Sequence, residues 1–324
     1  MGDHYEEHKP ISYRQAHTNS VNQTGNKRKR KRKGKFFLII FLLIIGVGAY
    51  FVFNLYQQMN YAFDQMYEPI GSAVPRLRDT EITLGDDPFS ILILGLDEGR
   101  TDSMMVATVN PTLDTTYLLS IPRDTMIHFP GLWTSRINHA FAYGGIDLTI
   151  ETVQNFLNIP IDYHVSLYMD QFHSLVDAFG GITVNNDAIE FSMGGYNFPL
   201  GEITLTGSMA YYYVRMRMDD PRGDFGRQER QRDVLAAMVN ELAGVTVVTR
   251  YQDILDSVGD NMRTNIMLNE MITMSLGYNR ALRNVTNLGF QASGSITNGM
   301  YLIPIPEDQL GATSQRLRRH LELE

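Results

Sequence analysis

An unbroken apolar run near the N-terminus dominates the hydrophobic pattern. Residues 36–53 read FFLIIFLLIIGVGAYFVF and carry no charge. As a helix these residues span about 27 Å, close to the hydrocarbon thickness of a bilayer. A signal peptide would have a shorter apolar region followed by a small-residue cleavage site, whereas NLYQ follows here. The pattern predicts an uncleaved transmembrane helix over residues 36–55.

After residue 88 the pattern alternates between short apolar runs, which predict strands, and amphipathic stretches, which predict helices. This mixture predicts an α/β domain with a central mixed sheet flanked by helices. Residues 56–88 lack a clear period and are expected to form a stalk. The expected strands are Phe89–Leu96, Met104–Val109, Thr115–Ile121, Ile182–Val184 and Met300–Ile305, and the expected helices are Leu148–Leu157, Met169–Phe179, Arg227–Leu242 and Asn269–Leu276.

Charge is distributed unevenly along the chain. Residues 27–35 contain eight basic residues and no acidic one, directly before the apolar run. By the positive-inside rule, residues 1–35 lie in the cytoplasm and the chain after residue 55 lies outside the cell. The chain after residue 35 carries 18 basic residues, all arginine, against 33 acidic ones, which makes it a poor partner for nucleic acid.

Several kinds of chemistry are excluded or disfavoured. The chain has no cysteine, which excludes disulfides, thiolate catalysis and cysteine-based zinc sites. The histidines lack zinc-site spacing, and no P-loop or dinucleotide fingerprint is present. Arginine can bind phosphate through two N–H donors at once, so the positions of the arginines are the most informative feature for a phosphate-binding site.

The first candidate site lies between the first two predicted strands. Asp97 and Asp102 are carboxylates five residues apart, and Arg100 lies between them. Hard oxygen ligands suit Mg²⁺ or Mn²⁺ shared with a phosphate, and the arginine would balance the remaining phosphate charge. The alternative is a solvated acidic loop with a local ion pair.

Arg123 follows the third predicted strand, in the motif SIPRD. If the strands are adjacent, it leaves the sheet at the edge where Asp97 lies. The alternative is a surface arginine.

The motif YYYVRMR ends a stretch that begins as a helix at Ser208. Read as a strand, its period-two alternation places Arg215 and Arg217 on one face, about 7 Å apart, a span that fits a pyrophosphate. The alternative is that both arginines are solvent-exposed on an edge strand.

The next helix carries an arginine on its apolar stripe. Arg227 and Gln231 are i,i+4 neighbours and continue into the stripe of Val234 and Met238. A buried arginine near a helix N-terminus needs a buried anion, and the helix end favours an anion at the same place. The alternative partner is Asp224, three residues before Arg227.

At these motifs the chain resembles the LytR-CpsA-Psr family of Gram-positive cell-wall proteins. The resemblance covers Phe89–Leu242 and includes ILILGLD, RTDSMM, SIPRDT, RINHAFAYGG, YYYVRMR and GDFGRQERQ in order. The loop between Asp97 and Arg100 is shorter than in many relatives. The implied organisation is a cytoplasmic basic tail (1–35), a transmembrane helix (36–55), a stalk (56–88), the catalytic core (89–245) and a C-terminal part of the extracellular domain (246–324).

The resemblance implies a phosphotransferase that moves an anionic glycopolymer from a polyprenyl-pyrophosphate carrier to peptidoglycan. The glycopolymer would be wall teichoic acid, capsule or a secondary wall polysaccharide. A hydrolase that cleaves the carrier pyrophosphate and a membrane-bound transcriptional regulator remain alternatives. The implied metal ligands are Asp97 and Asp102, the implied catalytic residues are Asp97, Arg100 and Arg123, and the implied pyrophosphate-binding residues are Arg100, Arg123, Arg215, Arg217, Asp224, Arg227 and Gln231.

Overall fold

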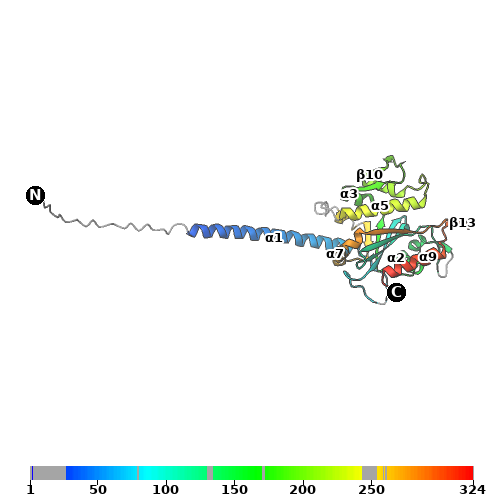
Figure 1. Cartoon of the computed structure of the whole chain (residues 1–324), viewed down its shortest axis with the longest axis horizontal. Helices are drawn as coiled ribbons and strands as arrows, with labels where there is room; N and C mark the ends of the chain where they lie inside the picture. Colours follow the sequence, from blue (N-terminus) through cyan, green and yellow to red (C-terminus); the bar gives the residue numbers. More distant parts are fainter. Residues whose placement is uncertain are drawn as a thin grey trace. The chain divides into compact units, whose positions relative to one another are not determined.

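The computed structural model describes residue 2 and residues 27–78, 80–129, 134–169, 172–242, 254–257, 259 and 261–323. The chain divides into two units, Met1–Leu55 and Tyr56–Glu324. Helix α1 (Lys27–Met66), labelled in Figure 1, includes residues of both units. The boundary expected between residues 245 and 246 lies outside the described residues.

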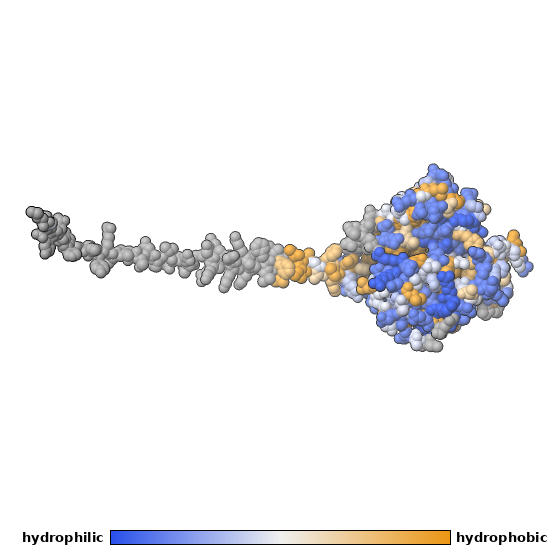
Figure 2. All heavy atoms as spheres, in the orientation of Figure 1, coloured by the Kyte–Doolittle hydropathy of each residue, from blue (hydrophilic) through white to orange (hydrophobic). Residues whose placement is uncertain are grey.

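Helix α1 confirms the expected apolar helix and is longer than predicted. Its segment Phe41–Met66 is long and apolar enough to cross a membrane. Large apolar side chains between Phe41 and Phe53 are exposed, and they form the orange segment of the helix in Figure 2. This exposed apolar run makes α1 a candidate membrane span.

Residues 56–88, for which the sequence predicts a stalk, cluster with the compact unit. The helix continues to Met66 because Met59, Phe63 and Met66 recur at helical spacing and pack against Leu268. Further along, Val74 contributes to the largest core cluster.

A six-stranded mixed sheet forms the centre of the second unit, with strand order β11-β6-β1-β2-β3-β12. Strand β1 pairs antiparallel with β2 and parallel with β6, and β3 pairs antiparallel with β2 and parallel with β12. The predicted mixed sheet is therefore confirmed. Its strands are β1 (Phe89–Asp97), β2 (Arg100–Asn110), β3 (Thr115–Ser120), β6 (Tyr163–Tyr168), β11 (Met262–Thr264) and β12 (Val285–Gly289).

Helices cover both faces of this sheet, as Figure 1 shows for α2, α9 and α5. Helices α2 (His139–Leu157) and α9 (Glu307–His320) pack on the face that carries Leu92, Leu94 and Val106. The alternate residues of these strands point to the opposite face. Among them, Met105 and Ala107 pack against Leu235 of α5 (Asp224–Leu242). The period-two alternation of β1 and β2 thus separates two cores.

The segment between β6 and α5 builds a second core beside the sheet. Its buried residues include Phe179, Phe198, Leu205 and Tyr213, and they pack against the buried face of α5. The antiparallel pair of β7 and β10 forms one wall. The elements are α3 (Phe172–Phe179), β7 (Ile182–Asn186), β8 (Phe191–Met193), β9 (Tyr196–Phe198), β10 (Gly201–Leu205) and α4 (Gly207–Arg215).

The start of β1 is closed by two short helices, α7 (Leu268–Gly277) and α8 (Asn279–Arg283). Tyr278, which joins them, packs edge-on against Phe89 with 4.7 Å between ring centroids. The remaining strands are β4 (Met126–His128), β5 (Thr134–Arg136), β13 (Ser295–Thr297) and β14 (Met300–Leu302), the last being the shorter form of the expected strand Met300–Ile305.

Candidate active site

The two acidic residues of the first motif lie at the hairpin that joins β1 and β2. Glu98 and Gly99 both have positive φ, as a two-residue type I′ turn requires, and Asp97 pairs directly with Arg100. The pairing register then skips Asp102 opposite Gly95 and Leu96. A bulge of this kind redirects a side chain, and it brings Asp102 to the cavity that Asp97 also lines.

Arg123 lies in the turn that follows β3, where the backbone N–H of Thr125 donates to the carbonyl of Pro122. Its Nη1 lies 2.9 Å from Oδ1 of Asp102. Burial lowers the pKa of Arg123, but the carboxylates of Asp102 and Asp124 outweigh burial and raise it. The sequence placed Arg123 at the same edge of the sheet as Asp97, and the structure confirms this placement.

Arg215 is the last residue of helix α4, and the strand predicted for YYYVRMR is wrong. The hydroxyl of Thr206 caps the helix by accepting from the N–H of Met209. Ala210, Tyr213 and Val214 then form a buried stripe at helical spacing, so tertiary packing overrides the local alternation. The predicted spacing of about 7 Å between two arginines on one strand face therefore does not apply.

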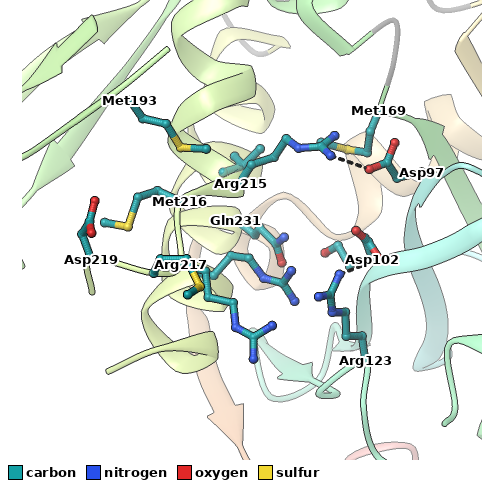
Figure 3. A pocket seen from close by; sticks show the side chains of 14 residues that line it. Asp97, Asp102, Arg123, Met169, Met193, Arg215, Met216, Arg217, Asp219 and Gln231 are labelled. Carbon is teal, nitrogen blue, oxygen red and sulfur yellow. Dashed lines mark ion pairs between the residues drawn. The ribbon is translucent and has the colours of Figure 1, made fainter. Parts of the chain in front are cut away.

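The outcome for the two arginines is nevertheless the expected one, because Arg215 and Arg217 line the same cavity. Nη2 of Arg215 lies 2.8 Å from Oδ2 of Asp97, and its guanidinium lies 4.8 Å from the ring of Tyr211. Figure 3 shows Arg215 reaching Asp97 on one side of the cavity and Arg123 reaching Asp102 on the other.

Arg227 lies in the first turns of α5, which begins at Asp224 rather than at Arg227. It is 5% exposed, and its Nη2 lies 2.6 Å from Oδ1 of Asp224. Burial lowers the pKa of Arg227, and Asp224 offsets part of that effect. Arg227 and Gln231 both line the cavity, whereas Asp224 is not among its lining residues. The structure therefore shows the contact with Asp224, whereas binding of an anion by Arg227 stays a prediction that its place in the cavity lining allows.

Together these residues line a cavity of about 400 Å³, the size of a typical small-ligand site. The lining also has apolar parts, which include Met169, Met193, Met216 and Met218. Several buried polar atoms around it lack a hydrogen-bond partner, including Nε of Arg123 and of Arg227. Burying a donor without a hydrogen-bond partner costs free energy. Such donors are therefore expected where a site binds an anion.

A second, more polar lobe adjoins this cavity and shares Asp97, Asp102, Arg123 and Arg215 with it. Arg100 lines only this lobe; it is half-exposed and lies 3.8 Å from Glu98. The lobe also contains Arg136 and Asn138, which sequence reasoning missed. The motif RINHA, quoted for the resemblance, was the available signal for both.

Sequence reasoning also missed Arg230, which is the largest fully buried side chain among the described residues. Its Nη1 donates to Oδ2 of Asp220 at 2.7 Å, and its Nε donates to the carbonyl of Tyr213 at 3.1 Å. Burial raises the pKa of Asp220, but hydrogen bonds from Arg222 and Arg230 lower it overall, to about 2. Arg230 thereby ties α5 to the segment that carries Arg217. The signal was its position four residues before Val234 on the buried stripe.

The carboxylates also fit a divalent cation. Arg215 binds Oδ2 of Asp97 and Arg123 binds Oδ1 of Asp102, and these ion pairs leave the other oxygen of each carboxylate for a metal. No group of three or more histidine and acidic residues suited to a metal occurs in the described part of the chain. Mg²⁺ commonly binds through one or two carboxylates together with substrate phosphates, so the donor set suits a cation shared with a ligand.

A mixed sheet whose strand ends bring arginines and two carboxylates into one cavity defines an anion-binding α/β domain. Comparison with known families identifies it further: the profile of the LytR_cpsA_psr family matches residues 52–319. The chain belongs to this family.

Its relatives have assigned names. The chain is 38% identical over 303 residues to TagU of Bacillus subtilis, named polyisoprenyl-teichoic acid–peptidoglycan teichoic acid transferase, covering 91% of this chain and 98% of that protein. The TagU of Halalkalibacterium halodurans, which has the same name, is 42% identical over 295 residues, with 88% and 95% covered.

Solved structures show the same fold. The crystal structure of Bacillus subtilis TagU has a TM-score of 0.61 at 39% identity and covers 73% of this chain and 97% of its own. The structure of TagT bound to LIIa-WTA has a TM-score of 0.67 at 28% identity, and the match covers 79% of this chain and 100% of that one.

Proposed function

We propose that the protein transfers a teichoic acid or a related anionic glycopolymer from a polyprenyl-pyrophosphate carrier to peptidoglycan, outside the cell. The observation that carries the proposal is that Arg123, Arg215, Arg217 and Arg227 line one cavity with Asp97 and Asp102. A pyrophosphate diester carries two negative charges next to each other, and an arginine cluster stabilises such charge best where water is excluded. The names of the TagU relatives support this donor and this acceptor.

The proposed reaction is an in-line displacement at phosphorus. A sugar hydroxyl of peptidoglycan attacks the phosphorus nearest the polymer, and the bond from that phosphorus to the bridging oxygen breaks. Polyprenyl phosphate leaves, and the polymer remains joined to peptidoglycan by a phosphodiester. Arg217 and Arg227 neutralise charge on the transferred and leaving oxygens, which is where phosphoryl transfer gains most.

Asp97 is the proposed general base. Its Oδ2 is held by Arg215 at 2.8 Å, which fixes the carboxylate and leaves Oδ1 to accept the proton of the attacking hydroxyl. Asp102 would be the main ligand of Mg²⁺ or Mn²⁺, and Asp97 would help to hold the cation until its Oδ1 takes the proton; a bound cation would supply positive charge next to the phosphate oxygens. Asp102 is in turn fixed by Arg123.

The proposed anchor is helix α1, with residues 1–35 in the cytoplasm and the second unit outside, because the basic run directly precedes the apolar segment. A reporter fused after Glu324 should be active only outside the cell, and protease added to intact protoplasts should remove the domain. Protection of residues 90–320 from that protease would overturn the topology.

The test of the proposed function is acceptor dependence. Purified full-length protein is mixed with a lipid-linked teichoic acid precursor, with and without peptidoglycan fragments, and release of polyprenyl phosphate is measured. The proposal predicts release that requires the acceptor and that is lost in Arg217→Ala. Equal release without acceptor would replace the transferase with a pyrophosphate hydrolase that uses water as nucleophile.

A further inference from the structure

One end of the second unit carries exposed apolar side chains that its cores do not use. We name these six residues the basal patch: Leu113, Met267, Met271, Ile272, Leu276 and Val285. Leu276 is the most exposed of them at 78%. Isolated exposed apolar residues need no explanation, but a group at one end of a domain marks an interaction surface.

The patch residues share one end of the central sheet. Leu113 lies in the turn between β2 and β3, beside Asp114, whose carbonyl accepts from Asn284 at 3.0 Å. Val285 begins β12 and pairs with Thr116 at the start of β3. The other four residues lie on or directly before α7, and Tyr278 at the end of α7 packs on Phe89 at the start of β1.

The apolar face of α7 is continuous with the end of α1. Leu268, Ile272 and Leu276 are spaced four residues apart, so they form one stripe along the helix. At one end of the stripe, Leu268 is buried against Phe63 and Met66 of α1. The stripe then continues exposed through Ile272 and Leu276.

The neighbouring part of α1 indicates what covers the stripe. Phe63 lies eight residues after Leu55, where the predicted span ends, which is about 12 Å along a helix. The headgroup layer on each side of a bilayer is roughly 5–8 Å thick, so the part of α1 that contacts α7 follows soon after the segment that would cross this layer. Tyr56 and Tyr61 of α1 are exposed in this interval, and tyrosine is favoured at membrane interfaces.

We propose that the basal patch rests on the outer surface of the lipid bilayer and orients the domain on it. The inference rests on the proposed membrane anchor and goes beyond it, because a single helix would leave the domain free to tilt. The patch closes the end of the sheet where β1 begins, and Asp97 ends this nine-residue strand. A strand of that length is about 30 Å long. The arginine cavity would therefore lie at the end of the sheet away from the lipid, nearer to the wall.

The chain has no cysteine, so a single introduced cysteine can be labelled without interference. Leu276→Cys carries the environment-sensitive fluorophore NBD, and full-length protein is reconstituted in vesicles of phosphatidylglycerol and phosphatidylethanolamine. Leu200→Cys, at an exposed residue before β10, is the matched control, and Val47→Cys reports on the anchor. Quenching by nitroxide-labelled lipid is compared with quenching by aqueous iodide.

The inference predicts that lipid nitroxide quenches the label at position 276 several-fold more than iodide does, with the reverse order at position 200. Equal access of iodide to positions 276 and 200, with position 47 protected, would contradict the contact of the basal patch with lipid and would leave the proposed anchor unaffected. Access of iodide to position 47 would contradict both the proposed membrane anchor and the contact of the basal patch with lipid. Protection at 276 that depends on protein density rather than on lipid would assign the patch to a second copy of the chain.

A second measurement reports on activity. Ile272→Ser combined with Leu276→Ser should slow transfer from a donor embedded in vesicles several-fold and leave transfer from a short-chain, water-soluble donor unchanged. Leu200→Ser should change neither rate. Equal slowing of both donors by the double variant would contradict a role in membrane docking.

Discussion

Arg215 and Asp97, which are distant in the chain, meet with 2.8 Å between Nη2 and Oδ2. The arginine ends helix α4 and the aspartate ends strand β1, so their contact joins the central sheet to the second core across the cavity. Arg123 and Asp102 repeat the arrangement on the other side of the cavity. Each carboxylate is thus oriented by an arginine that also faces the bound phosphate in the proposed function.

Replacing Arg215 tests this arrangement. Arg215→Ala should lower kcat by about 10²-fold to 10³-fold, the usual effect of removing one donor to a transition-state oxyanion. Because Arg215 is more than a third exposed, the melting temperature should barely change. Arg280→Ala, which breaks an exposed pair with Asp114, is the control and should leave both quantities unchanged. Full activity of Arg215→Ala would remove this arginine from the site.

Variants of Arg227 and Asp224 distinguish a role in phosphate binding from a role in stabilising the fold. Removing Asp224 leaves the buried guanidinium unpaired, so Asp224→Ala should destabilise the protein by about 3–5 kcal/mol. Arg227→Lys keeps the charge but loses the two-point grip on phosphate, so it should remain folded and be inactive. An Arg227→Ala protein that is unstable but fully active per folded molecule would contradict phosphate binding.

Arg230 should act through structure alone. It is 2% exposed and bonds Asp220 at 2.7 Å, so Arg230→Ala should cost about 3–5 kcal/mol in the free energy of unfolding. The matched variant Arg222→Ala removes the more exposed partner of the same carboxylate and should cost less than about 1 kcal/mol. Chemical denaturation measures both; equal costs would contradict a special role for the buried partner.

The domain should lose stability in mild acid through His320. Burial, followed by the charge of Arg316, lowers the pKa of His320 from 6.5 to about 4. Its two ring nitrogens lie 2.9 Å from the hydroxyls of Thr108 and Thr115. Between pH 6.5 and 4 the unfolded chain binds more protons at this residue than the folded protein does. The contribution of neutral His320 to the free energy of unfolding is therefore fully present above pH 6.5, and it falls by roughly 3 kcal/mol as the pH approaches 4.

Denaturation curves at pH 7 and pH 4.5 check this prediction. His320→Gln should be less stable than the wild type at pH 7 and should lose less of its stability between the two pH values. An identical pH dependence in the two proteins would assign the acid sensitivity to other groups.

The strands of the sheet and most site residues could be predicted because their signals are local. The apolar runs of β1 and β2 follow from burial on both faces, and Asp97, Asp102 and Arg123 directly follow or interrupt such runs. Strand adjacency then suffices to bring them together. The chosen residues Arg215, Arg217, Arg227 and Gln231 lie at the same cavity.

The errors arose where tertiary contacts decide. YYYVRMR alternates like a strand, but α4 is fixed by the Thr206 cap and by burial of Tyr213. The only local signal for Arg230 is its position four residues before Val234, because its partners, Asp220 and the carbonyl of Tyr213, lie outside its own helix. The extension of α1 to Met66 depends on Leu268, which is distant in the sequence.

The fate of one phosphorus atom tests the central claim most directly. A polyprenyl-pyrophosphate donor is prepared with ³³P only in the phosphorus nearest the polymer, and the full-length protein is given this donor together with peptidoglycan. The account predicts that the label becomes covalently bound to peptidoglycan together with the polymer, while unlabelled polyprenyl phosphate is released. Label that remains on the lipid, or that appears as soluble polymer phosphate while peptidoglycan stays unlabelled, would contradict it.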